Sequence, residues 1–123
     1  MKPVRLSCIL ILATLAICSC KNSPSTIVAG NYSGPYTRDT VILGAATSNV
    51  TDINPLTVSI IVDLENDPDF NLNNVAVNSD SVGYELQYNG TEGTMTGTIL
   101  GTHLNWTLMS ATDTISFTGT KQP

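Results

Sequence analysis

Apolar and polar residues alternate with a period of two through much of the chain after residue 26. The clearest run is at residues 56–64, where Thr57, Ser59 and Asp63 occupy the positions between apolar ones. Successive side chains of a β-strand point to opposite faces, so this pattern predicts a strand with one buried face. The positions expected to be buried are Leu56, Val58, Ile60, Val62 and Leu64.

The same alternation recurs in four segments of the second half, which predict strands at residues 82–88, 94–100, 103–109 and 114–119. Asn89-Gly90, between the first two, is a strong signal for a tight hairpin turn. Short turns between successive strands predict an antiparallel meander. The residues expected to point inward are Val82, Tyr84, Leu86, Tyr88, Met95, Ile99, Leu104, Trp106, Leu108, Ile115 and Phe117.

The first half is less regular. Residues 27–34 and 40–44 favour strands, with Pro35 at a bend between them, and residues 74–78 favour a short strand. Residues 45–54 are compatible with either a loop or an edge strand. No window shows a sustained helical period, and β-formers dominate the composition.

These patterns predict an all-β fold of about seven or eight strands. A small antiparallel meander that closes into a barrel is preferred, because closure leaves no unpaired strand edge. A β-sandwich is the alternative. Its strands have the same alternation of apolar and polar residues.

The first residues follow a different pattern. Lys2 and Arg5 precede an apolar run at residues 6–17, after which come Cys18, Ser19 and Cys20. A charged start, an apolar stretch and small residues before a cut are the parts of a secretory signal. A transmembrane anchor is the weaker reading, because a membrane-spanning helix needs about 20 apolar residues.

The segment Ile17-Cys18-Ser19-Cys20 resembles a bacterial lipobox. The resemblance implies a diacylglyceryl group on the Cys20 thiol, cleavage just before Cys20, and usually a further acyl chain, such as palmitate, on the new amino terminus. It divides the chain into a signal peptide (1–19), a lipidated tether (20–26) and a β-domain (27–123). Cys8 and Cys18 would leave with the signal. Lys21, after the cysteine, implies the outer membrane. An ordinary signal peptide with incidental cysteines is the alternative.

The charge balance excludes one class of partner. The formal net charge is −5, and Lys21, Arg38 and Lys121 are the only cations from Cys20 onward, against ten acidic residues. Binding to nucleic acid depends on clustered lysine and arginine, so we expect no nucleic-acid partner.

Catalytic signatures are weak. His103, the one histidine, falls opposite Leu104 and Trp106 in the alternation and should face solvent. No Ser-His-Asp set, paired-carboxylate motif or Cys-His metal spacing stands out in the sequence. We therefore expect no enzyme activity and no cofactor.

The most acidic stretch places carboxylates at every second position: Asp63, Glu65, Asp67 and Asp69. Ca²⁺ takes six to eight oxygen ligands, so such a loop is a weak candidate calcium site. The EF-hand pattern is not met, because Pro68 stands where that loop has glycine. A solvated loop whose charges protect a turn from aggregation is the favoured interpretation.

Aromatic residues on the apolar faces allow two interpretations. Tyr84, Tyr88, Trp106 and Phe117 can line a pocket for a small apolar ligand, because ligand pockets are mostly apolar with a few polar groups. More often such residues fill the interior of a small barrel. The first interpretation requires an interior cavity, and the second requires a filled core.

The chain from Gly93 onward resembles the tail of small lipoproteins of the Bacteroidetes, which have Gly/Thr-rich hairpins and a closing Phe-x-Gly-Thr-Lys phrase, here residues 117–121. "DTV", "DSV" and "DTI" also resemble the O-glycosylation motif of exported proteins of that phylum. The acceptors that this implies are Thr40, Ser81 and Thr114. Gly30-Asn31-Tyr32 is faintly similar to the opening of lipocalin barrels but lacks their tryptophan.

We therefore expect a lipid-anchored outer-membrane lipoprotein with a non-enzymatic binding or structural β-domain. Its expected partners are the membrane, through the lipid on Cys20, and a small apolar ligand or another envelope protein. The alternative is a lipocalin-like carrier of a small apolar ligand.

Overall fold

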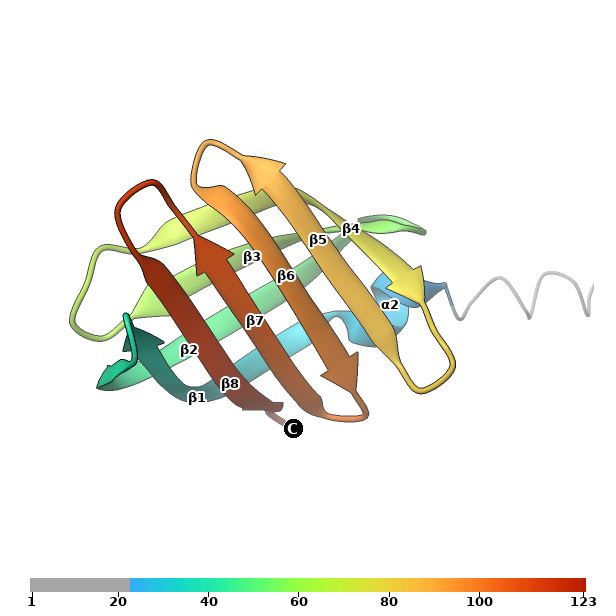
Figure 1. Cartoon of the computed structure of the whole chain (residues 1–123). Helices are drawn as coiled ribbons and strands as arrows, with labels where there is room; N and C mark the ends of the chain where they lie inside the picture. The colour runs from blue at the N-terminus through green and yellow to red at the C-terminus, as the bar shows by residue number, and fades with distance from the viewer. Residues whose placement is uncertain (1–22) are drawn as a thin grey trace, which may run out of the picture.

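A computed structural model describes residues 23–123 as an eight-stranded closed barrel with one short helix (Figure 1). The elements are α2 Pro24–Val28, β1 Gly30–Arg38, β2 Val41–Asn54, β3 Thr57–Leu64, β4 Phe70–Ser79, β5 Tyr84–Gly90, β6 Gly93–Leu100, β7 His103–Met109 and β8 Thr114–Lys121.

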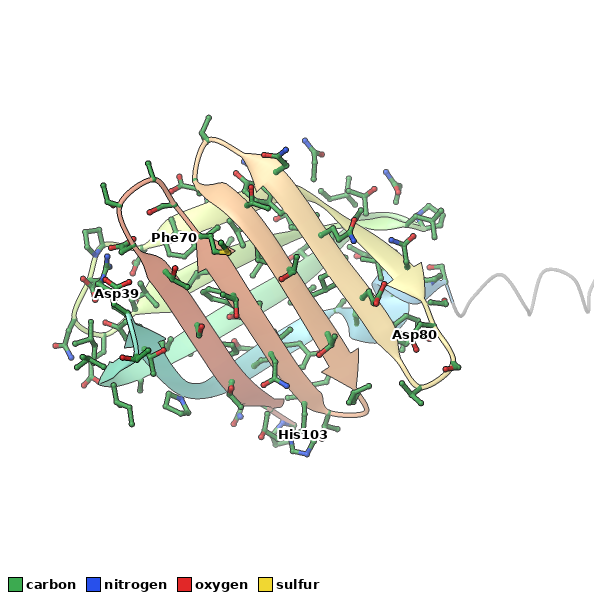
Figure 2. The ribbon with its side chains drawn as sticks, in the orientation of Figure 1. Asp39, Phe70, Asp80 and His103 are labelled. Carbon is green, nitrogen blue, oxygen red and sulfur yellow. The ribbon has the colours of Figure 1, made fainter. Side chains whose placement is uncertain are left out.

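Each strand pairs antiparallel with the next, and β8 pairs with β1 to close the barrel. The predicted all-β meander is therefore confirmed as a barrel, and the sandwich is not formed. Consecutive strands run in opposite directions, so the connections alternate between two ends. We call the end that holds α2 and the β2–β3, β4–β5 and β6–β7 connections the tether end, and the opposite end the distal end. Asp80 lies at the tether end and Asp39 at the distal end (Figure 2).

The alternating apolar residues fill the interior. In β3, Val58, Ile60 and Val62 are fully buried and Leu64 is nearly so. In β5 to β8 the expected inward residues are buried as well, except that Tyr84 is half-buried. Two expectations are wrong: Leu56 is 57% and Val82 is 74% exposed. Each precedes the first residue of its strand, so the alternation extends into a connection that no longer faces the core.

Trp106 lies at the centre of this core. Its ring stacks on Phe117, with centroids 5.6 Å apart, and meets the edge of Phe70 at 6.2 Å. Its indole Nε1–H donates to Oγ of Ser48 at 3.0 Å, and both side chains are buried. Gly97, on the neighbouring strand, makes this packing possible, because a Cβ there would lie 2.9 Å from that of Trp106.

The first half of the barrel departs most from expectation. Residues 45–54, which the sequence left open, form a single long strand with 41–44 in β2. Pro35 is not at a bend but inside β1, opposite Ala45 of β2. On its other side the β1–β8 ladder skips Gly34 and Pro35, so the missing N–H of proline interrupts no pair there.

Helix α2 is absent from the sequence-based expectation, which placed residues up to Thr26 in the tether and began a strand at Ile27, whereas Ile27 and Val28 belong to the helix and β1 begins at Gly30. Pro24 opens the helix at its first turn, where proline is favoured. The Ser25 N–H donates to the Pro55 carbonyl at 3.1 Å, and the Tyr32 hydroxyl donates to the Val28 carbonyl at 2.8 Å. Val28 is fully buried. The helix therefore packs against the tether end of the barrel.

Candidate functional sites

The expected lipidation site lies outside the described residues. Cys20, the signal peptide (1–19) and Lys21 precede Ser23, where the description begins. The anchor therefore stays a prediction from the sequence. What the structure adds is the place where the chain enters the barrel, at α2 on the tether end.

The four aromatic residues proposed for a ligand pocket lie on strands β5, β7 and β8. Trp106, Phe117 and Tyr88 are at most 7% exposed, and Tyr84 is half-buried. Trp106 and Phe117 stack directly on each other. The side chains from the neighbouring strands thus fill the space between them, as in a packed small barrel.

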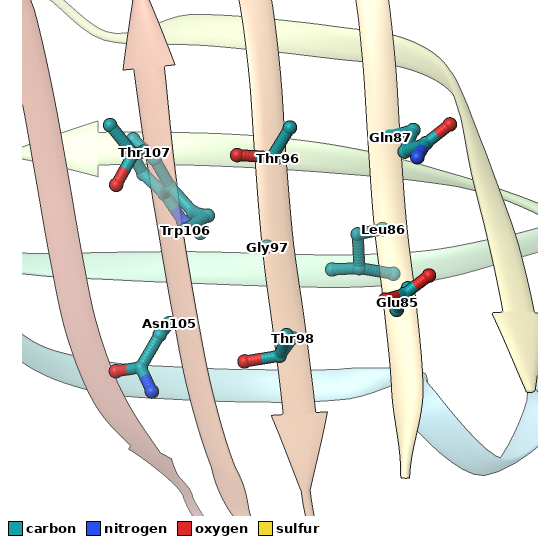
Figure 3. A pocket seen from close by; sticks show the side chains of 9 residues that line it. All are labelled: Glu85, Leu86, Gln87, Thr96, Gly97, Thr98, Asn105, Trp106 and Thr107. Atoms are coloured by element: carbon teal, nitrogen blue, oxygen red, sulfur yellow. The ribbon is translucent and has the colours of Figure 1, made fainter. Parts of the chain in front are cut away.

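A hollow of about 360 Å³ lies on the outer face of β5, β6 and β7. Its walls are two rows of outward side chains (Figure 3): Gln87, Thr96 and Thr107 in one, and Glu85, Thr98 and Asn105 in the other. Between them lie the inward-facing positions Leu86, Gly97 and Trp106. The rows follow the strand register, in which Thr96 is opposite both Gln87 and Thr107.

This hollow offers hydroxyl and amide groups and one carboxylate. Such groups suit hydrogen bonds to a neutral polar surface. Its lining contains no histidine, cysteine or lysine that would supply a base or a strong nucleophile.

The distal end holds a charged cluster around Arg38, at the end of β1. Its guanidinium binds Asp67 in the β3–β4 loop at 3.0 Å and also pairs with Asp113 in the β7–β8 loop. The Tyr36 hydroxyl donates to Asp67 at 2.6 Å and accepts the Asn66 N–H at 3.2 Å. Burial raises the pKa of Tyr36, and its hydrogen bond to Asp67 raises it further. The cluster ties two loops to β1.

The sequence pattern did not identify Arg38. It is the only arginine after the leader, and it follows a strand-like segment, but nothing in the sequence shows which acids it meets. Asp67 and Asp113 are far from it along the chain and reach it only once the barrel closes.

Three of the four acidic residues of the candidate calcium loop have separate partners elsewhere in the protein. Asp67 binds Arg38 and Tyr36, Glu65 accepts the Ala45 N–H at 2.9 Å, and Asp69 accepts the Leu64 N–H at 3.1 Å. A hydrogen bond with Asp69, together with its negative charge, raises the pKa of Asp63. Over residues 23–123, no three histidine, cysteine or acidic side chains converge on a position that would hold a metal. The carboxylates of Glu65, Asp67 and Asp69 are thus engaged by groups of the protein itself.

The proposed glycosylation acceptors lie at or beside connections. Thr40 and Ser81 are exposed, and Thr114 is half-buried at the start of β8. Thr40 and Asp39 form the β1–β2 turn and both have positive φ, 74° and 51°. A hairpin turn of this form favours Asn-Gly, so Thr40 holds a costly conformation for a β-branched residue.

His103 is exposed at the start of β7, as the alternation predicts (Figure 2). From Ser23 to Pro123, no helix has the length and apolar character needed to cross a membrane.

Comparisons with known proteins place the fold but not a family. No family model matches the sequence, and no curated protein matches it. A crystal structure of a putative outer membrane protein from Bacteroides fragilis is similar, with a TM-score of 0.64 and 19% identity. The match covers 80% of this chain but only 53% of that one, so this chain spans about half the length of its structural neighbour. At this identity the similarity shows a shared barrel architecture.

Proposed function

We propose that this protein is a lipid-anchored lipoprotein of the outer membrane, held by acyl chains on Cys20, whose barrel is a non-enzymatic binding or structural module. The observation that carries the proposal is the orientation of the barrel's side chains. Apolar residues fill the inside, and the outward rows of β5 to β7 are polar. Barrels that span a membrane have the reverse pattern, with an apolar band outside. A polar exterior suits a barrel in water that reaches the membrane through a tether.

The anchor itself is supported by the lipobox-like segment that ends at Cys20. Several acyl chains, each contributing about 0.8 kcal/mol per buried CH₂, hold a protein stably, whereas one chain is marginal. Lys21 and the described location of the Bacteroides fragilis neighbour both support the outer membrane.

Contact through the outer surface is favoured over transport of a ligand inside the barrel. A lipocalin-like carrier would need room among Tyr84, Tyr88, Trp106 and Phe117, and the Trp106–Phe117 stack occupies that space. The polar hollow over Gly97 is open to solvent and needs no rearrangement to receive another envelope component.

The test is the intact mass and membrane fractionation of the protein expressed in a bacterial host that processes lipoproteins. We expect a mass that corresponds to residues 20–123 plus acyl chains, and recovery in the outer-membrane fraction. Cys20→Ser should abolish both, whereas the matched control Cys18→Ser should change neither. A Cys20→Ser protein that still fractionates with membranes would contradict the lipid-anchor proposal.

A further inference from the structure

Both ends of the barrel expose apolar side chains, but the tether end exposes five of them, whereas the distal end exposes three, Val41 (58%), Ile42 (73%) and Met109 (59%). The tether end exposes Ile27 (41%), Ile53 (52%), Leu56 (57%), Val82 (74%) and Leu100 (46%). They come from four segments that are distant in the sequence: α2, the β2–β3 hairpin, the β4–β5 loop and the end of β6. The closure of the barrel brings these segments together at one end.

Contacts link these segments in two pairs at the tether end. The Ser25 N–H binds the Pro55 carbonyl, and the Thr26 hydroxyl binds Asp52, which joins α2 to the hairpin that carries Ile53 and Leu56. On the other side, the Leu100 side chain lies against Gly83, next to Val82. Lys121 Nζ donates to the Ile27 carbonyl at 3.2 Å. The exposed apolar residues therefore form two groups at the same end, one on α2 and the β2–β3 hairpin and one on β6 and the β4–β5 loop.

The acidic residues are distributed in the opposite way, with more of them toward the distal end. Of the ten acidic residues, seven lie on the distal half: Asp39, Asp63, Glu65, Asp67, Asp69, Glu92 and Asp113. Asp52, Asp80 and Glu85 lie on the half nearer the tether. A carboxylate placed against a lipid surface loses hydration, and anionic lipids repel it. The distal end is therefore unsuited to contact with a membrane, and the tether end is suited to it.

The length of the tether restricts which end can meet the lipid. Four residue steps separate Cys20 from Pro24, and a fully extended chain covers at most about 14 Å over that distance. The headgroup layer on one side of a bilayer is roughly 5 to 8 Å thick. An acylated Cys20 thus keeps the start of α2 within about 6 to 9 Å of the headgroups, and the distal end faces away.

We infer that the tether end docks on the phospholipid surface, with Ile27, Ile53, Leu56, Val82 and Leu100 in the interfacial layer and the acidic distal end toward water. This inference rests on the proposed anchor at Cys20. Partial burial of exposed apolar side chains at the headgroup boundary adds to the hold of the acyl chains, and it gives the barrel a fixed orientation rather than free rotation on its tether.

The test is amide hydrogen exchange of the acylated full-length mature protein in phosphatidylethanolamine–phosphatidylglycerol vesicles, compared with Cys20→Ser protein in lipid-free buffer. We expect exchange at residues 53–57 and 80–83 to slow several-fold in vesicles, and exchange at residues 38–42 and 65–69 to stay unchanged. Equal protection at both ends, or none at the tether end, would overturn the docking.

Matched variants test whether the exposed apolar side chains cause the protection or whether the tether alone, by holding this end near the membrane, is enough. Val82→Asp combined with Leu56→Asp should remove the protection at the tether end. Ile42→Asp should not, although Ile42 on the distal end is as exposed (73%) as Val82 (74%). If the tether-end protection survives the double variant, the apolar residues do not cause it, and the inference is wrong.

Two further outcomes identify which premise fails. An intact mass with no acyl chains removes the proposed anchor and the docking together, whereas an acylated protein without tether-end protection removes only the docking. If residues 53–57 and 80–83 of Cys20→Ser protein become protected with rising protein concentration and no lipid, the surface binds a second copy of the chain instead.

Discussion

The first four strands and the last four form the two halves of the barrel, and the halves differ in how regular their strands are. Strands β5 to β8 are seven or eight residues long, and their pairings run without a shift in register. Strands β1 to β4 are 8 to 14 residues long, and each of their three pairings contains a shift. The first half also contains the non-glycine residues with positive φ, Asp39, Thr40 and Asn74.

The difference shows where curvature is produced. Irregularities in a ladder bend a strand and increase its twist, which a small barrel needs in order to close. The regular half provides stacked aromatic residues, and the irregular half bends to meet them and places Ser48 against Trp106. Side-chain contacts at the distal end then hold the irregular half, through Arg38 and Tyr36.

The contact between the halves should give the largest effect. Trp106→Ala removes a buried ring that packs on Phe70 and Phe117, and we expect a loss of about 3 to 5 kcal/mol in the free energy of unfolding. Urea denaturation measures it. Trp106→Phe keeps an aromatic ring but leaves the Ser48 hydroxyl without its donor, so a smaller loss of about 1 to 3 kcal/mol is expected. A loss below about 1 kcal/mol for the alanine variant would mean that the ring is not a core element.

Breaking the charged cluster should affect the two distal loops that it joins to β1. Arg38→Gln leaves Asp67 and Asp113 without their cation. The three side chains are 30%, 19% and 17% exposed, so solvent screens the pairs in part, and we expect a loss of about 1 to 2 kcal/mol. Amide exchange should quicken at residues 65–69 and 110–113 and stay unchanged in the β5–β6 turn. Equal quickening in that turn would show that the cluster does not act locally.

Relieving the β1–β2 turn should stabilise the protein. Thr40 has φ 74°, a conformation that costs an ordinary residue about 1 to 2 kcal/mol and glycine little. Thr40→Gly should therefore raise the free energy of unfolding by about 1 kcal/mol, after the added flexibility of the unfolded chain is subtracted. The same substitution at Thr120, an exposed residue within β8, should lower it. If Thr40→Gly is also destabilising, the turn does not carry this strain.

The smallest effect concerns the acidic loop and depends on pH. A hydrogen bond with Asp69 raises the pKa of Asp63 above the ordinary value of 3.8, so the folded protein holds this proton more tightly than the unfolded chain. The stability that this proton contributes is present at acid pH and is lost as the pH rises through the raised pKa. Asp63→Asn should raise the melting temperature at neutral pH and have little effect well below pH 3.8.

Glu85→Gln removes an equal charge from the outer face of β5 and controls for the net charge of the protein. A melting-temperature gain of the same size from that control, or a gain for Asp63→Asn that does not change with pH, would contradict a local interaction between Asp63 and Asp69.

The regular half was predictable because each of its strands is bounded by turn residues and alternates cleanly. The inward series from Leu86 to Phe117 was enough to predict the meander. Asn89-Gly90 correctly indicated a hairpin, but both residues end β5 and pair with β6, and the turn itself is Thr91-Glu92. Alternation does not mark where a strand ends, so Leu56 and Val82 were predicted to be buried although they precede their strands.

The irregular half was less predictable for physical reasons. The inward positions of β2 are Ala46, Ser48 and Val50, of which one is small and one is polar, so the alternation of apolar and polar residues is hidden there. A register shift at residues 52–54 then ends the alternation. Helix α2 is five residues long and depends on its contacts with Pro55 and Tyr32 rather than on its own helical propensity. Arg38, Asp67 and Asp113 become neighbours only through closure, so no local pattern indicated their cluster.

The pairing of β1 with β8 also determines when the molecule can fold. Tyr32 pairs with Lys121, almost the whole domain apart in sequence, so loop-closure entropy opposes that contact until the other hairpins have shortened the distance. Until then the growing sheet has two unpaired edges, which invite pairing with other chains. A polypeptide exported from its amino terminus delivers β8 last, so we expect truncations that remove β8 to aggregate rather than to yield a smaller soluble domain.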